Sequence, residues 1–205
     1  MGAARKRLST GTAIVLAAGF VAATPQVATA VPPGFTDTVA ISGLTQPTVA
    51  AFAPDGRVFV GEKSGIVKTY DSLADSTPTT TVDLRSKVHD FWDRGLLGFT
   101  VDPQYPARPY AYALYSYDSK PGGGQWGDTC PTPPGATDNG CVISARLSKL
   151  TLNANGVSTN EQPLITDWCQ QYPSHSIGTV TFGPDGSLYV GGGDGASFNF
   201  ADYGQ

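Results

Sequence analysis

The sequence predicts an all-β fold built like a β-propeller, from a recurring hairpin, a two-residue hydrophobic period and a scarcity of helix signals. The run FAPDGRVFVGE begins at Phe52 and FGPDGSLYVGG begins at Phe182, so one phrase occurs twice, and a degenerate third copy begins at Leu96. Pro presets φ, Asp bonds its own backbone and Gly accepts positive φ, so Pro-Asp-Gly before an alternating strand predicts a hairpin. A hairpin that recurs along one chain indicates a repeat architecture.

Short antiparallel strands are expected to follow one another along the chain. Apolar residues alternate with polar ones in segments such as 57–60, 110–114 and 187–190, which are bounded by Gly, Pro, Asp and Ser. The expected strands start near Val49, Val58, Ile66 and Thr80, then near Leu97, Tyr110, Ile143 and Gly156, and finally near Thr179 and Leu188.

The spacing of the Pro-containing turns matches the size of a propeller blade. Pro54 and Pro103 lie about 49 residues apart, and Pro184 follows about 81 residues later, after an inserted segment at 119–140. A four-stranded unit of roughly 40–50 residues is one blade. A sandwich or jelly roll also has many short strands, but neither explains why the same hairpin returns. Residues 31–205 hold about two and a half blades where a ring needs about four to eight, so we expect the N-terminal part of a longer propeller.

Residues 1–30 have the pattern of a secretory signal peptide. Arg5, Lys6 and Arg7 form a basic start, residues 13–23 are apolar, and Ala28-Thr29-Ala30 is a cleavage site. The alternative is a membrane anchor, but the apolar run is shorter than the roughly 20 residues that a span needs. We therefore expect an exported protein, secreted or held in the cell envelope, that begins near Val31 and has no transmembrane segment after cleavage.

The charge balance bears on the kind of partner. The whole chain carries −4, and removing three basic and no acidic residues with the signal leaves −7. An acidic chain argues against nucleic acid and against an anionic membrane surface. Charged residues are sparse and Gly and Pro are abundant, as in short strands joined by turns, while evenly spread aromatic residues argue against low-complexity disorder.

Three cysteines fit an oxidising compartment. Cys130 and Cys141 flank the turn-rich run PTPPGATDNG, which predicts a local disulfide that clamps this loop. Cys169 is then left over, and it is expected either as an exported thiol or with a partner outside this chain.

Two ordered motifs resemble the soluble quinoprotein glucose/sorbosone dehydrogenases. The first is HSIGTVTFGPDGSLYV at 175–190, continued by Asp194-Gly195, and the second is DRGLLGF at 93–99, followed by Asp102-Pro103. The opening LTQP at 44–47 with FAPDG at 52–56 is similar to the family's first blade. The resemblance covers residues 35–205.

This resemblance implies a six-bladed propeller with pyrroloquinoline quinone over the central channel and calcium nearby. The implied reaction oxidises the anomeric hydroxyl of a sugar, with hydride transfer to the quinone and then electron transfer to a small or protein acceptor. His175 matches the catalytic base, Asp93 a position lining the cofactor pocket, and Asp194 an acidic position near the sugar. Without the resemblance, the simplest interpretation of His175 is a side chain that caps a turn. The simplest interpretation of the two aspartates is a carboxylate that hydrogen-bonds the local backbone.

The chain departs from the family pattern beside the histidine. Relatives commonly have Gly-Gly-Arg where this chain has Ile177-Gly178-Thr179, and an Asp or Asn where it has Ser174, which supplies no charge to orient the imidazole. The cations that grip the quinone and the calcium ligands belong to later blades of the family, so this portion alone is expected to be inactive. The alternative function is a non-catalytic extracellular propeller that binds glycan or protein partners, and a third is a metal-dependent propeller lactonase or other hydrolase.

Other chemistry-bearing residues have simpler interpretations. His89 with Asp90 and Asp93 looks like a metal cluster, but no second histidine or cysteine is spaced to complete it, which favours a charged loop between blades. The glycine-rich run 191–195 is followed by no helix signal, which argues against a phosphate cradle. Tyr115 and Tyr117 are expected to pack within strands, with sugar stacking as the alternative.

Overall fold

The described part of the chain is built from antiparallel β-sheets. A computed structural model describes residues 31–32, 34–125 and 141–196. The chain divides into two units at residue 38, and everything below concerns the second, residues 39–205. The predicted signal at 1–30 and Cys130 lie outside the described residues. Within them, no helix has the length and apolar character needed to cross a membrane.

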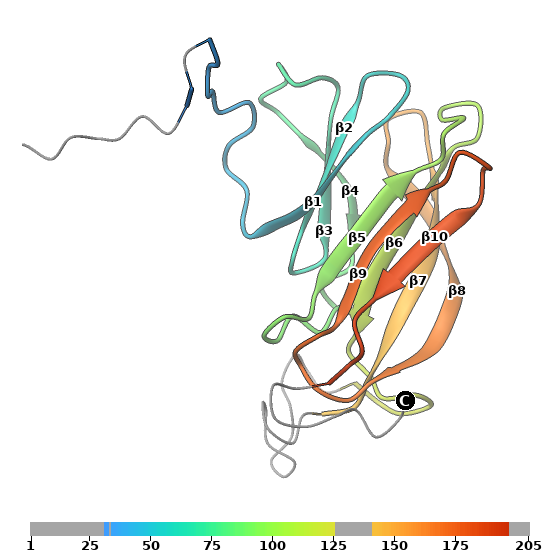
Figure 1. The fold of residues 1–205 in the computed structure, drawn as a ribbon. Coiled ribbons are helices and arrows are strands. Elements are labelled where there is room, and N and C mark those ends of the chain that lie inside the picture. Colours follow the sequence, from blue (N-terminus) through green and yellow to red (C-terminus); the bar gives the residue numbers. More distant parts are fainter. Residues whose placement is uncertain (1–30, 33, 126–140, 197–205) are drawn as a thin grey trace, which may run out of the picture. The chain divides into compact units, whose positions relative to one another are not determined.

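Ten strands are described, and they form two four-stranded sheets and one two-stranded sheet (Figure 1). The first sheet contains β1 (Pro47–Phe52), β2 (Val58–Glu62), β3 (Ile66–Tyr70) and β4 (Thr79–Asp83). The second contains β5 (Leu96–Val101), β6 (Tyr110–Tyr117), β7 (Ile143–Leu152) and β8 (Ser158–Gln170). The third contains β9 (Ile177–Phe182) and β10 (Leu188–Gly192). Each strand pairs antiparallel with its sequence neighbour, so each sheet is a meander, as the sequence predicts.

Both Pro-Asp-Gly turns have the predicted geometry. In the first, the Asp55 carboxylate accepts the Arg57 amide at 3.2 Å, and Gly56 has a φ of 94°. In the second, the Asp185 carboxylate accepts the Ser187 amide at 3.0 Å, and Gly186 has a φ of 78°. The side-chain bond of Asp and the positive φ of Gly close both turns by one mechanism.

Successive sheets pack face to face, which places the apolar core between them. The core between the first and second sheets centres on Phe59, which lies 5.8 Å from the Phe99 ring centroid and edge-on to Tyr105 at 6.1 Å. The second core joins the second sheet to β9 and β10, with Tyr112 against Phe182 at 5.4 Å. The first strands of the three sheets are neighbours, because β1 packs against β5 and β5 against β9. This is the arrangement of consecutive propeller blades.

The predicted packing role of the strand tyrosines is confirmed for Tyr115. Its side chain is fully buried, and its hydroxyl donates to Glu161 at 2.6 Å, so it is not available for stacking on a sugar. Tyr117 lies under the Arg146 guanidinium, 3.4 Å from its ring centroid. His89 lies in the loop between β4 and β5, as predicted, but its side chain is fully buried and edge-on to Phe91.

The Glu161 carboxylate holds a polar cluster together beside the first core. It accepts hydrogen bonds from Tyr115, from Ser148 at 2.8 Å and from Lys87. Burial alone raises the pKa of Glu161, but the hydrogen bonds from these three donors outweigh it, so the pKa lies below the ordinary value of 4.5. The folded protein therefore binds fewer protons at this site than the unfolded chain. The stability that the carboxylate contributes is present above pH 4.5 and is lost as the pH falls through the folded pKa.

We expect Glu161→Gln to lower the free energy of unfolding by roughly 1–3 kcal/mol at neutral pH, because the buried hydroxyls of Tyr115 and Ser148 lose a charged acceptor. Thermal unfolding followed from neutral pH down to about pH 3 checks this. The gap between the melting temperatures of wild type and variant should shrink as the pH falls below 4.5. A gap that stays constant over this range would contradict the role given to the carboxylate.

Candidate functional site

The loops that lead into β1, β5 and β9 meet at one end of the sheets, here called the lead-in end. The Lys63 amide donates to the Gln46 carbonyl at 2.9 Å, and the Leu96 amide donates to the Lys63 carbonyl at 2.8 Å. On the other side, the Asp93 amide donates to the Pro173 carbonyl at 3.2 Å. Main-chain bonds therefore connect the lead-in segments of all three sheets, although they are far apart in the sequence.

Backbone strain is concentrated at this end. Among the described residues, the non-glycine residues with positive φ are Gln46 (47°), Trp92 (55°) and His175 (51°). Each stands just before the first strand of its own sheet, and all three are exposed. Positive φ is uncommon outside glycine and is retained where the surrounding structure enforces it, often at functional sites. Each of the three sheets therefore has a strained residue within four positions of its first strand.

His175 and Asp194 form a pair at the lead-in end. His175 Nδ1 lies 3.0 Å from Asp194 Oδ1, and the two side chains are 39% and 63% exposed. A second bond fixes the two segments, because the Gly195 amide donates to the His175 carbonyl at 3.0 Å. Hydrogen bonds hold the pKa of Asp194 below its usual range, the larger effect coming from the Ala196 amide and the smaller from the His175 ring. Asp194 is therefore a carboxylate at neutral pH.

The arrangement determines what the imidazole can do. A carboxylate that accepts from Nδ1–H fixes the ring tautomer and orientation, so Nε2 carries the lone pair. A neutral imidazole held in this way can accept a proton and is stabilised as imidazolium by the adjacent carboxylate. The pair therefore has the two groups that a histidine general base needs, an imidazole and a carboxylate that orients it.

Asp194 reveals a contact that sequence reasoning missed. The sequence places it near a sugar and finds no acidic partner for His175, because Ser174 precedes the histidine. In the structure Asp194 supplies that carboxylate from 19 positions further along the chain, by the numbers of the two residues. The Ser174 hydroxyl instead donates to the Ala196 carbonyl at 3.0 Å and fixes the loop that carries Asp194. Contact with a sugar stays a prediction for Asp194.

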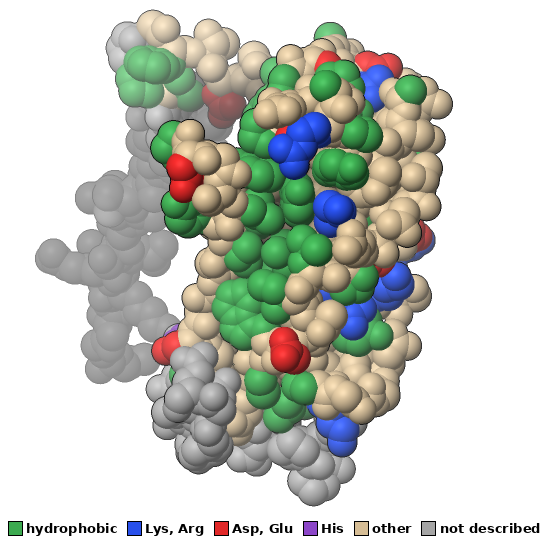
Figure 2. Space-filling view, turned by 90° about the vertical axis from the view of Figure 1, so that its right-hand side faces the viewer, with side chains coloured by type: hydrophobic (Ala, Val, Ile, Leu, Met, Phe, Trp, Pro, Cys, Tyr) green, Lys and Arg blue, Asp and Glu red, His purple; other side chains and the backbone are tan. Residues whose placement is uncertain are grey.

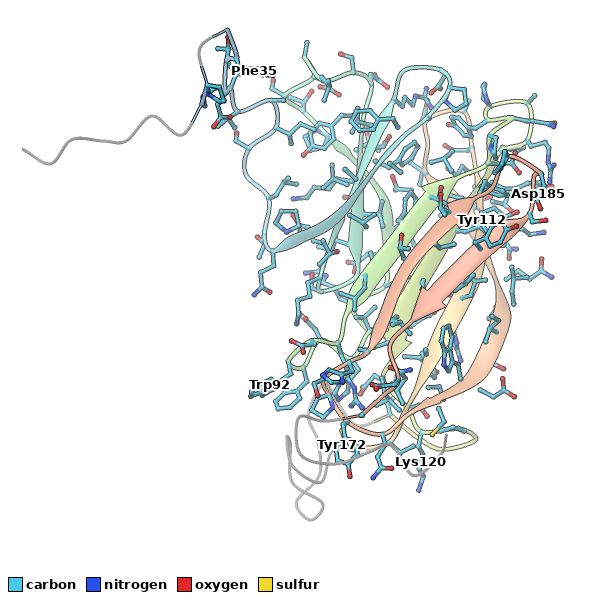
Figure 3. The ribbon with its side chains drawn as sticks, in the orientation of Figure 1. Phe35, Trp92, Tyr112, Lys120, Tyr172 and Asp185 are labelled. Carbon is cyan, nitrogen blue, oxygen red and sulfur yellow. The ribbon has the colours of Figure 1, made fainter. Side chains whose placement is uncertain are left out.

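Asp93 and Trp92 lie beside the segment that carries His175. Asp93 is exposed, and its amide donates to the carbonyl of Pro173, which lies two residues before His175. Trp92 is 54% exposed. Figure 3 shows Trp92 and Tyr172 at the end where β5 and β9 begin, and Tyr112 and Asp185 toward the opposite end. The position agrees with a ligand-facing role for Asp93, and its contact with a cofactor stays a prediction.

Arg94 is a second feature that sequence reasoning missed. It is fully buried although it follows the exposed Asp93 in the sequence, and its guanidinium contacts the segments of Cys141 and Gln170. The only available signal was an arginine between an aspartate and an apolar strand, which does not reveal burial. Cys141 is also buried, and its predicted disulfide stays a prediction because Cys130 lies outside the described residues. Within the described ranges no group of three or more His, Cys, Asp or Glu side chains could hold a metal ion.

Solved structures share this fold. The PQQ-bound aldose sugar dehydrogenase of Streptomyces coelicolor superposes with a TM-score of 0.60 at 17% identity, covering 79% of this chain and 42% of that one. A glucose dehydrogenase-type oxidoreductase of Thermus thermophilus gives 0.57 at 24% identity, with coverage of 76% and 39%. The apo form of the soluble aldose sugar dehydrogenase of Escherichia coli gives 0.51 at 17% identity, with coverage of 77% and 40%. These matches confirm the predicted propeller class.

Sequence relatives include proteins of another kind. The mouse and human Hedgehog-interacting proteins are each 27% identical over 162 residues, and the match covers 76% of this chain but 21% of theirs. The HIPL1 protein of Arabidopsis thaliana is 24% identical over 180 residues, covering 72% of this chain and 26% of its own length. This chain thus spans about a quarter or less of these relatives. The sequence pattern of the family described as Glucose / Sorbosone dehydrogenase matches residues 44–203. The chain belongs to the glucose/sorbosone dehydrogenase family.

Proposed function

We propose that the protein is an exported sugar dehydrogenase that oxidises the anomeric hydroxyl of an aldose, with His175 as the base. The observation that carries the proposal is the bond between His175 Nδ1 and Asp194 Oδ1 on strained backbone at the lead-in end. Family membership supports the dehydrogenase reaction, and the pattern of residues 1–30 supports export.

The proposed step uses this chain for the proton. His175 Nε2 takes the proton of the anomeric hydroxyl. At the same time the C–O single bond becomes a C=O double bond, and the anomeric carbon loses a hydride. When bound, pyrroloquinoline quinone supplies the two-electron acceptor for that hydride. Asp194 stabilises the imidazolium that forms, and returning the proton to solvent resets the base. The product is a lactone, so atoms and electrons balance.

The described residues fit the proton-transfer part of this site. The quinone also carries carboxylates, which require cations. Of the described cations at the lead-in end, Lys63 pairs with Asp90 and the Arg94 guanidinium binds main-chain carbonyls. We therefore assign the cations for the quinone, and the ligands for calcium, to other blades of the whole protein.

The surfaces of the outer sheets support the proposal that residues 31–205 are the N-terminal part of a larger propeller. On the first sheet, an apolar cavity of about 390 Å³ lies on the face opposite Phe59, lined in part by Ile41, Leu44, Val58 and Val60. On the third sheet, β10 pairs with β9 alone among the described strands. Figure 2 shows apolar side chains gathered on one face, with lysine and arginine side chains beside them. Further blades at both places would cover these surfaces.

A second candidate is a non-catalytic propeller that binds a protein or glycan outside the cell. The observation that favours it is the similarity to the Hedgehog-interacting proteins, whose name describes a protein-binding function. The exposed Thr179 on β9, where family members commonly have arginine, agrees with it. The first candidate predicts turnover with an aldose, and the second predicts none.

The decisive test mixes the full-length apoprotein with pyrroloquinoline quinone and calcium and follows dye reduction with a panel of aldoses. We expect sugar-dependent turnover and a rise in melting temperature on adding the quinone, because a ligand that binds only the folded state stabilises it. The absence of both turnover and a quinone-dependent thermal shift would exclude the dehydrogenase and leave the binding propeller.

A further inference from the structure

Arg94 joins three segments through one buried guanidinium. Its Nη2 donates to the main-chain carbonyls of Cys141 at 2.7 Å, Gln170 at 3.0 Å and Gln171 at 3.2 Å, and Nη1 contacts the Cys141 sulfur at 3.2 Å. Arg94 is the largest of the fully buried side chains in the described part of the chain. A planar guanidinium offers five donors in a fixed fork, so it can satisfy several carbonyls that no strand partner reaches.

Among the described residues, no carboxylate pairs with Arg94. No ion pair found among residues 31–125 and 141–196 includes it, and its Nε has no hydrogen-bond partner there. Burial lowers the pKa of Arg94 to about 9, so the group is still charged at neutral pH. The described groups that compensate this cation are main-chain carbonyls and the Cys141 sulfur. Burying a cation with such partners is unfavourable, so net stability alone does not explain this side chain.

The carbonyls that Arg94 binds belong to the segment that leads to His175. Gln170 is the last residue of β8, and His175 follows five positions later, before β9. Two further bonds hold this segment: Asp93 to Pro173, and the Tyr172 amide to the Gly195 carbonyl at 3.3 Å. Arg94 fixes the start of the segment, and the loop of Asp194 fixes its end.

We propose that Arg94 is a positioning residue, which sets the location of His175 relative to Asp93 by anchoring the end of β8. Loss of the anchor would free the carbonyls of Gln170 and Gln171 and relax the strained backbone at His175. The base would then sample positions outside its contact with Asp194. Displacement of a reacting group by about 1 Å can cost roughly a hundredfold in rate.

The first test measures amide hydrogen exchange of residues 171–176 in the full-length protein and needs no turnover. Arg94→Met keeps the length of the side chain and removes all donors. We expect it to speed exchange in this segment by roughly tenfold or more, because local opening governs exchange there. Arg94→Lys retains a charged donor and should give a smaller increase, and it serves as the test variant if Arg94→Met does not fold.

Glu161→Gln is the matched control, because it breaks a buried polar cluster on the same strand, β8, without touching residues 170–175. It should lower the melting temperature and leave exchange in 171–176 unchanged. Equal exchange in this segment for wild type and the Arg94 variants, or an equal increase in the control, would overturn the proposal.

The second test uses turnover and rests on the proposed function. We expect Arg94→Met to lower kcat roughly tenfold to a hundredfold with KM nearly unchanged, and Arg94→Lys to restore part of the loss. Glu161→Gln should keep both constants. A wild-type kcat in Arg94→Met would overturn the positioning role. A wild type without turnover would remove the proposed function, and the exchange measurement would still decide the role of Arg94.

Discussion

Replacing His175 by alanine is expected to lower kcat for aldose oxidation by roughly 10²–10⁴-fold in the full-length protein, the usual contribution of a general base. The imidazole that Asp194 orients is the proton acceptor of the proposed step, and alanine leaves only water for this role. KM should change little, because the lost interaction forms in the transition state. Steady-state rates with a saturating dye, at varied aldose concentration, separate the two constants.

The aspartate partner provides a graded version of the same experiment. Asp194→Asn keeps the shape of the side chain but removes the charge that stabilises the imidazolium, so we expect a smaller loss of kcat than for His175→Ala. Asp185→Asn is the matched control, because Asp185 also accepts a main-chain amide in a turn but lies toward the opposite end of the sheets. An unchanged kcat in His175→Ala would remove the histidine from the mechanism. Unchanged affinity for a partner protein or glycan, together with no turnover in wild type, would instead identify the binding propeller.

Gly95→Ala is expected to destabilise the folded protein by roughly 3 kcal/mol or more, a large share of the stability of a typical domain. Gly95 has a φ of 149°, which side chains rarely tolerate. A Cβ there would stand 2.6 Å from the Lys63 carbonyl oxygen, which also accepts the Leu96 amide. The obstacle is main chain that joins the lead-in segments of the first two sheets, so it cannot simply rotate away. Denaturant unfolding of the purified protein measures the effect.

Gly124→Ala is the control for this substitution, because nothing lies within 4 Å of a Cβ at Gly124 and its φ is not positive. It should change the free energy of unfolding by less than about 0.5 kcal/mol, as surface substitutions usually do. Equal stability of the two variants would show that the close approach of Gly95 to Lys63 is not maintained in solution.

The strands could be predicted because their signals are local. β2, β3, β6, β7 and β10 begin at the predicted residues, and the other five begin within about two residues of them, because alternation and turn residues define both ends of such strands. The Pro-Asp-Gly turns were predicted with their mechanism, since every participant lies within four residues. The repeat of the hairpin then predicted the architecture, which the structural matches confirm.

The site could be predicted only in part because its contacts are not local. His175 and Asp194 were both identified, but their bond depends on how far the β9–β10 hairpin brings its two ends together. The burial of Arg94 depends on the end of β8, some 76 positions away by residue number. Charge in a sequence suggests exposure, and only the packed structure shows that carbonyls surround this guanidinium.

The hairpin turns have a practical consequence for work with the protein. β9 separates His175 from the turn at Gly186, and a six-residue strand spans about 20 Å. Gly186 has open space around it, and its turn stands at the end opposite Trp92. A cysteine or peptide tag introduced beside this turn would tether the molecule to an electrode or bead with the lead-in end facing the liquid. The same phrase that repeats in the sequence therefore provides a handle for oriented immobilisation.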